Sequence, residues 1–146
     1  MESRKQQLDR FFVHYEEIFM QSLKEKAPAE EVMSMYAEYF IGSNPKGVMG
    51  GRNDEEFGKS LTQGYDFYRE IGVTGMYLIS QEHALLDDYH ALSKTIWRCE
   101  FIRKKDNSVQ SIEFENYYFV RSENEQLKIF GYITGDEEAV WKDLIQ

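Results

Sequence analysis

The sequence predicts an α+β protein in which helices come first and strands follow. Apolar residues recur at three- and four-residue steps over the first half of the chain, and alternate with polar residues over most of the second half. Both prolines lie in the first third. Segregated helices and strands favour an α+β arrangement over repeated βα units. The length of 146 residues predicts a single domain, 1–146.

The first predicted helix runs from about Ser3 to Lys24, because its apolar residues share one helical face. Pro28 is a residue type favoured in a first helical turn, and it predicts the start of a second helix that reaches Phe40. The apolar face of this second helix would be Val32, Met33, Tyr36, Tyr39 and Phe40.

A loop over residues 42–53 follows, with four glycines and Pro45. Asn53 or Asp54 is expected to cap a third helix, which carries acidic residues in its first turn and ends near Gly72. Four strands are then predicted over 76–86, 89–104, 109–121 and 126–134, separated by polar turns. Asp136 is expected to cap a short C-terminal helix.

The register of these strands follows from assuming symmetric hairpins centred on 87–88, 106–107 and 123–124. Side chains alternate between the two faces of a sheet, so this assumption assigns each residue to a face. The inner face would then hold Asn116 opposite both Trp97 and Gly131, and it would also hold Glu82. His83 would project from the opposite face.

The outer face of the predicted sheet carries a contiguous apolar patch. Its members are Ile96, Tyr117, Phe119, Phe130 and Tyr132. In a monomer such a patch would be exposed to solvent, and exposed apolar patches usually mark an interface. We therefore expect a homodimer that forms through the outer sheet face.

The charge balance excludes several classes of partner. A net charge of −9 with pI ≈ 4.9 argues against nucleic acid and against an anionic membrane surface. The first residues lack the apolar run of a signal peptide, and no segment has the length of an apolar membrane span. With one cysteine, Cys99, there is no internal disulfide, so a cytoplasmic protein is expected.

The whole chain resembles the nuclear transport factor 2-like superfamily. The resemblance rests on the order of elements: a helix over 8–23, a helix over 32–40, the glycine-containing segment 47–53 before a third helix, and a long strand containing 97–101. It is a pattern of elements and includes no catalytic motif. The resemblance implies a cystatin-like α+β cone, in which three N-terminal helices pack in a strongly curved, mostly antiparallel sheet with a short C-terminal helix.

The superfamily includes SnoaL-like polyketide cyclases, ketosteroid isomerases, scytalone dehydratases and transport factors, so the fold does not determine the function. The leading hypothesis is the binding of a small, largely apolar molecule in the cone, because an aromatic cavity with few polar groups is typical of such sites. The predicted lining is Tyr15, Phe19, Tyr36, Trp97, Asn116 and Tyr118.

Two alternatives remain open from the residues. A cyclase-, isomerase- or lyase-like enzyme would use Glu82 or His83 as its acid or base. In the steroid isomerases the base follows the second helix, where this chain has no acid over 40–46. The other alternative is a protein-interaction module without a ligand. No cofactor is expected, and no metal, because the histidines lack a third ligand at suitable spacing.

Overall fold

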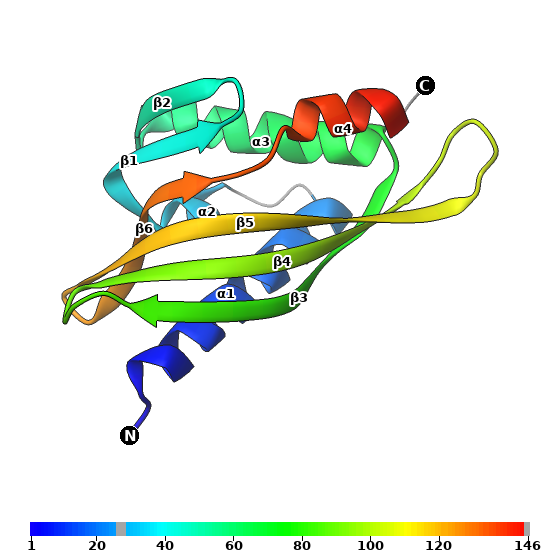
Figure 1. The fold of residues 1–146 in the computed structure, drawn as a ribbon. Helices are drawn as coiled ribbons and strands as arrows, with labels where there is room; N and C mark the ends of the chain where they lie inside the picture. The colour runs from blue at the N-terminus through cyan, green and yellow to red at the C-terminus, as the bar shows by residue number, and fades with distance from the viewer. Residues whose placement is uncertain (26–28, 145–146) are drawn as a thin grey trace.

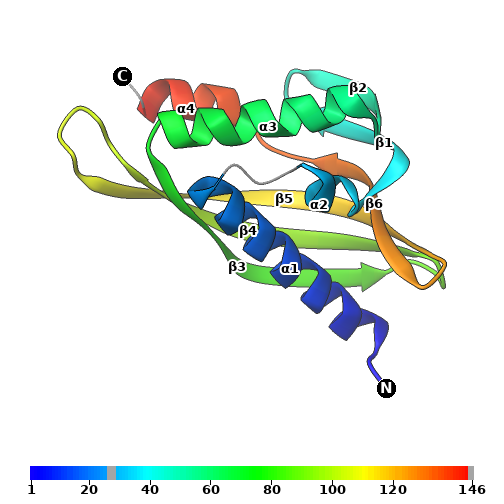
Figure 2. The ribbon, with the colours of Figure 1, turned by 180° about the vertical axis from the view of Figure 1, so that it is seen from behind.

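The computed structural model describes residues 1–25 and 29–144, and it shows four helices and one six-stranded sheet in this part of the chain (Figure 1). Across the sheet the strands lie in the order β2 (Gly47–Arg52), β1 (Tyr36–Asn44), β6 (Gln126–Ile133), β5 (Val109–Glu123), β4 (His90–Ile102) and β3 (Val73–Leu85). Every neighbouring pair is antiparallel except β1 and β6. The sheet curves, and α1 (Arg4–Lys24) lies across strands β3–β5 on one side (Figure 2). The α+β class is therefore confirmed. None of the helices in the described residues is both long and apolar enough to span a membrane.

Helix α1 (Arg4–Lys24) begins as predicted, because Ser3 and Gln6 form a reciprocal capping box with hydrogen bonds of 3.1 and 2.8 Å. Its apolar face enters the core, where Leu8 and Phe12 are fully buried. Helix α3 (Glu55–Glu70) is capped by Asp54, whose carboxylate accepts from the Phe57 amide at 3.2 Å.

The predicted second helix is wrong. Pro28 lies outside the described residues, and the helical part that follows is one turn, α2 (Glu30–Met33). Tyr36 begins a strand, β1 (Tyr36–Asn44), which turns back as β2 (Gly47–Arg52). Parallel pairing with the distant β6 stabilises β1 as a strand, so tertiary contacts override a spacing that also fits a helix. The segment predicted as a loop is thus mostly a hairpin.

The other strands lie close to their predicted ranges: β3 (Val73–Leu85), β4 (His90–Ile102), β5 (Val109–Glu123) and β6 (Gln126–Ile133). Helix α4 (Glu137–Leu144) follows, and the Asp136 carboxylate accepts from the Ala139 amide at 3.1 Å, as expected of a cap.

The register differs from the symmetric one between β4 and β5. Trp97 lies opposite Phe114, and Asn116 lies opposite Thr95 instead of Trp97. The hairpin loop spans residues 103–108, so its centre lies one residue before the predicted one. This displacement shifts each pairing by two residues, and an even shift keeps every side chain on its predicted face.

Two β-bulges do change faces. In β3 the register shifts between Leu78 and Ser80, where Glu16 of α1 accepts a hydrogen bond from the Leu78 amide at 2.6 Å. Glu82 therefore pairs with Lys94 and is exposed. His83 pairs with the buried Ser93, and its own side chain is 3% exposed. The predicted inward Glu82 and outward His83 are both wrong.

The second bulge lies between β5 and β6. The turn is at Asn124 and Glu125, both with positive φ, and the register then shifts so that Phe119 faces Gly131. Gly131 is thus not opposite Asn116, which corrects another predicted pair. Beyond the bulge Tyr132 pairs with Tyr118 and packs against the core, so its predicted position on the outer face is wrong.

Candidate functional site

The inside of the cone contains a cavity of about 170 Å³ between α1, α3, the sheet and the start of α4. All six residues predicted from the sequence to contact a ligand line this one cavity: Tyr15, Phe19, Tyr36, Trp97, Asn116 and Tyr118. The sequence did not indicate six further lining residues, which are Tyr68, Met76, Phe114, Tyr132, Thr134 and Glu137. Eight of these twelve side chains are aromatic.

The aromatic walls are held by ring contacts between different elements. The Tyr15 ring on α1 lies 6.1 Å from Trp97 and 6.0 Å from Tyr118, centroid to centroid. Phe19, one turn further along α1, makes an edge contact with Tyr65 of α3 at 5.1 Å. Such tilted and edge-on pairs stabilise the packing beyond simple area burial. The cavity is therefore bounded largely by packed rings.

Two of the lining hydroxyl groups form a buried pair. The Tyr15 and Tyr36 oxygens are 3.1 Å apart and share a hydrogen bond. Burial raises the pKa of both phenols well above the usual value, so both remain protonated at neutral pH. This bond uses one of the two phenolic hydrogens, and the other hydrogen has no acceptor among the hydrogen bonds of the described residues.

Asn116 differs from that pair because one of its polar atoms has no partner. The residue is 8% exposed, and its amide nitrogen donates to the Tyr118 hydroxyl at 3.5 Å. Its side-chain oxygen accepts no hydrogen bond from the described residues. A buried acceptor without a donor typically costs about 1–3 kcal/mol. The oxygen belongs to a residue that lines the cavity, so a donor placed there could satisfy it.

The cavity also holds a carboxylate, Glu137, that sequence reasoning missed. Glu137 is the first residue of α4, and its Oε2 accepts a hydrogen bond from the Tyr68 hydroxyl at 3.2 Å. Burial raises the pKa of Glu137, although the Tyr68 hydrogen bond opposes that effect. In the sequence Glu137 belongs to an acidic run that starts a helix, and nothing in that pattern distinguishes a residue that turns inward.

Neither predicted acid–base candidate lines this cavity. Glu82 is exposed. His83 lies between α1 and the sheet, where its ring nitrogens contact Ser93 Oγ at 2.8 Å and Asp9 Oδ1 at 3.0 Å. Ser93 is fully buried, so these three residues link α1 to the sheet and present no accessible nucleophile. Within the described residues no group of three or more His, Cys, Asp or Glu side chains is placed to hold a metal ion.

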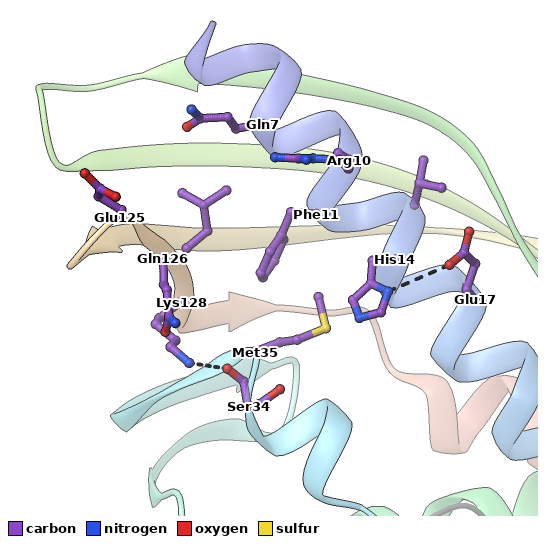
Figure 3. A pocket seen from close by; sticks show the side chains of 12 residues that line it. Gln7, Arg10, Phe11, His14, Glu17, Ser34, Met35, Glu125, Gln126 and Lys128 are labelled. Carbon is purple, nitrogen blue, oxygen red and sulfur yellow. Dashed lines mark hydrogen bonds and ion pairs between the residues drawn. The ribbon is translucent and has the colours of Figure 1, made fainter. Parts of the chain in front are cut away.

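A larger groove of about 620 Å³ lies on another side of α1, toward the hairpin of β5 and β6 (Figure 3). Phe11 and Met35 point into it, and charged groups line its edges. Several of those groups have partners within the protein: Arg10 pairs with Glu2 at 2.7 Å, His14 lies 3.7 Å from Glu17, and Lys128 donates to the Ser34 carbonyl. This groove therefore offers few unsatisfied polar groups to a ligand.

No protein-family model matches the chain, and no curated protein matches its sequence. The fold is identified by comparison with solved structures.

Solved structures do match. A protein provisionally assigned as a scytalone dehydratase from Novosphingobium aromaticivorans has a TM-score of 0.64 at 12% identity, covering 87% of this chain and 79% of that one. A nuclear transport factor 2-like superfamily protein from Salmonella enterica has a TM-score of 0.62 at 12% identity, covering 89% and 88%. A protein provisionally assigned as a calcium/calmodulin-dependent protein kinase II association domain from Xanthomonas campestris has a TM-score of 0.62 at 9% identity, covering 92% and 88%.

The chain therefore has the nuclear transport factor 2-like, or cystatin-like, fold that its order of elements resembles. At these identities the likeness concerns the fold alone, and proteins of this fold differ in function.

Proposed function

We propose that this protein binds a small, largely apolar molecule in the cone cavity. The observation that carries the proposal is the side-chain oxygen of Asn116, which is buried beside an aromatic cavity and accepts no hydrogen bond from the described residues. A ligand with one donor group would hydrogen-bond to this oxygen and remove the free-energy cost of leaving it without a donor. The ligand would also bury its apolar surface against the rings. Concave aromatic sites with a few placed polar groups are typical small-molecule sites.

The size of the cavity limits the ligand. An engineered protein cavity of about 150 Å³ accommodates benzene, so a cavity of this order holds one ring. The cavity here measures about 170 Å³. The proposed ligand is thus a single-ring compound or an acyclic molecule of similar volume.

Calorimetry with phenol and toluene tests this proposal, because the two differ by one donor hydroxyl. We expect the wild type to bind both and to prefer phenol. In Asn116→Leu the ratio of phenol affinity to toluene affinity should fall about tenfold. This change corresponds to about 1.4 kcal/mol for one hydrogen bond to a buried group. Ser111→Ala, on an exposed part of the same strand, is the matched control. If Asn116→Leu does not fold, Phe114→Trp should weaken both ligands by narrowing the cavity. A wild type that binds neither compound would contradict the proposal.

A cyclase-, isomerase- or lyase-like activity is the second candidate, and Glu137 is the observation that favours it. This carboxylate lines the cavity and its pKa is raised by burial, as is useful for a group that moves protons at neutral pH. Exchange of the α-hydrogens of cyclohexanone in D2O, followed by NMR, tests for such proton transfer. Faster exchange with the wild type than with Glu137→Gln would support it, and equal rates would exclude it for this compound.

We further propose that two copies pair through the outer sheet face. Ile96, Tyr117, Phe119 and Phe130 are half-buried residues of β4, β5 and β6. In the observed register Tyr117 pairs with Ile133, and Phe119 lies in line with Gly131 and Ile41. The exposed apolar residues Ile41, Val48 and Ile133 therefore extend the patch toward β2. The interaction-module alternative would use this same face without any ligand in the cone.

A further inference from the structure

The side chains that line the cavity include a negative charge and no positive charge among the described residues. Among its described lining residues Glu137 is the one carboxylate, and none is Lys, Arg or His. Its hydrogen-bond partner is the Tyr68 hydroxyl, a neutral donor, so the carboxylate has no cation to offset its charge among the described residues that line this site. A buried charge without an opposite charge is energetically costly.

A second acceptor lies on the wall of the same cavity. The Asn116 side-chain oxygen has no donor among the described residues, and Asn116 is 8% exposed. The hydroxyls of Tyr15 and Tyr36 are hydrogen-bonded to each other, and this bond does not compensate either acceptor. The two acceptors therefore require a hydrogen-bond donor, and the carboxylate also favours a positive charge.

The walls favour positive charge as well. The faces of aromatic rings carry a negative electrostatic potential and attract ammonium groups, and the attraction grows when the cation is shielded from water. Eight aromatic side chains line the cavity. An aromatic enclosure with a carboxylate and an amide oxygen matches a nitrogen cation with an apolar body.

We propose that the cavity takes a small protonated amine whose apolar part has the volume of about one ring, with its ammonium group bound by the Glu137 carboxylate and the Asn116 oxygen. This inference rests on the proposed binding function and specifies the chemical class of the ligand. It assigns Glu137 a recognition role that neither sequence nor fold indicates.

Three compounds with the same ring and different charge test the inference: cyclohexylamine, cyclohexanol and cyclohexanecarboxylate. By calorimetry at neutral pH we expect the amine to bind the wild type at least tenfold more tightly than the alcohol, and the carboxylate to show no binding. Glu137→Gln should remove the preference for the amine and keep the affinity for the alcohol. Glu113→Gln, an exposed glutamate on β5, is the matched control and should behave as the wild type.

The outcomes separate the two proposals. If wild type binds the amine and the alcohol equally, or if Glu137→Gln keeps the preference, the cationic ligand is excluded and the binding function stands. If wild type binds none of the three, the binding function fails for ring-sized molecules and the inference falls with it.

A pH series on the wild type keeps the inference testable if Glu137→Gln does not fold. The amine affinity should fall as the pH drops and Glu137 becomes protonated, while the alcohol affinity stays constant. The groups that interact electrostatically with Glu137 are Tyr68, Tyr118, Tyr132 and Cys99. Their pKa values are all raised by burial, that of Cys99 to about 12, so none of them titrates in the acidic range. An amine affinity that does not change over that range would overturn the inference.

Discussion

The two faces of strand β4 place neighbouring residues in opposite environments. On the inner face Thr95, Trp97 and Cys99 are buried at 0–3% exposure, and the indole nitrogen of Trp97 donates to the Thr95 hydroxyl at 2.8 Å. On the outer face Ile96 is half-buried, and Lys94 pairs with Glu115 at 3.2 Å. Lys94 and Glu115 thus neutralise each other on the outer face, whereas the cavity on the inner side keeps an acceptor without a donor and a carboxylate without a cation.

The contrast between paired and unpaired polar groups indicates where a ligand site lies. Paired charges at a surface contribute little to stability and ask for no further partner. Unpaired polar groups beside apolar walls are costly, and a ligand can remove that cost. The groove of about 620 Å³ is larger than the cavity of about 170 Å³, yet several of its charged groups, such as His14 and Lys128, already contact other groups of the protein. Buried polar groups without partners are therefore a better indicator of the site than volume.

The largest expected effect compares Trp97 with its neighbour Ile96. Trp97→Ala removes a large buried side chain and should lower the free energy of unfolding by about 3–5 kcal/mol. Ile96→Ala, on the half-buried outer face, should lower it by about 1 kcal/mol. Urea denaturation of both variants measures the difference. Equal losses would show that the outer face is buried as deeply as the inner one.

The second prediction concerns the apolar patch of the outer face. Phe119→Glu places a charge in the proposed dimer interface and should raise the dissociation constant by about 100-fold or more, because a charge without a partner is costly in an apolar contact. Sedimentation velocity over a range of concentrations measures this constant. Ile102→Glu, at the exposed end of β4, is the control and should leave it unchanged. A wild type that is monomeric at micromolar concentration would refute the interface itself.

The smallest expected effect is the pH dependence contributed by His83. Burial lowers the pKa of His83 below its ordinary value of 6.5, although Asp9 opposes the shift. The unfolded chain then binds more protons than the folded one as the pH falls through 6.5, so stability should decrease toward acidic pH. One proton contributes at most about 1.4 kcal/mol per pH unit.

His83→Gln should flatten this pH dependence between about pH 5.5 and 7, the range in which an unperturbed histidine titrates. Thermal unfolding at several pH values measures it. A slope that survives the loss of His83 would assign it to another group.

Much of the cavity could be predicted because the predicted register between β4 and β5 is wrong by an even number of residues. The pairing of Trp97 and Asn116 is displaced by two residues, and such a displacement preserves faces. Bulges are different, because one extra residue inverts every later side chain. The bulge after Leu78 depends on a hydrogen bond to Glu16 of α1, a tertiary contact that no local pattern in β3 reveals. The predicted faces of Glu82 and His83 are wrong because of this bulge, and that of Tyr132 is wrong because of the bulge between β5 and β6.

The failure of the second helix has a related cause. Tyr36, Tyr39 and Phe40 fit a helical spacing, and they fit a strand equally once a partner strand is present. β1 has two such partners: β2 follows it directly as a hairpin, and β6 is remote in the sequence. Glu137 could not be found from its local sequence, because its position depends on how α4 packs against Tyr68 of α3.

The parallel pair of β1 and β6 has a consequence for how the chain assembles. Ile41 pairs with Gly131, 90 residues further along the chain, so this contact requires the closure of a very long loop. Contacts of such separation form slowly, after local hairpins such as β4–β5. The cavity takes Tyr36 from β1, Tyr132 from β6 and Glu137 from α4, so its walls meet only when the last of these segments docks. Ligand binding would then report the completion of folding, and a chain released from synthesis would become competent to bind only at that final step.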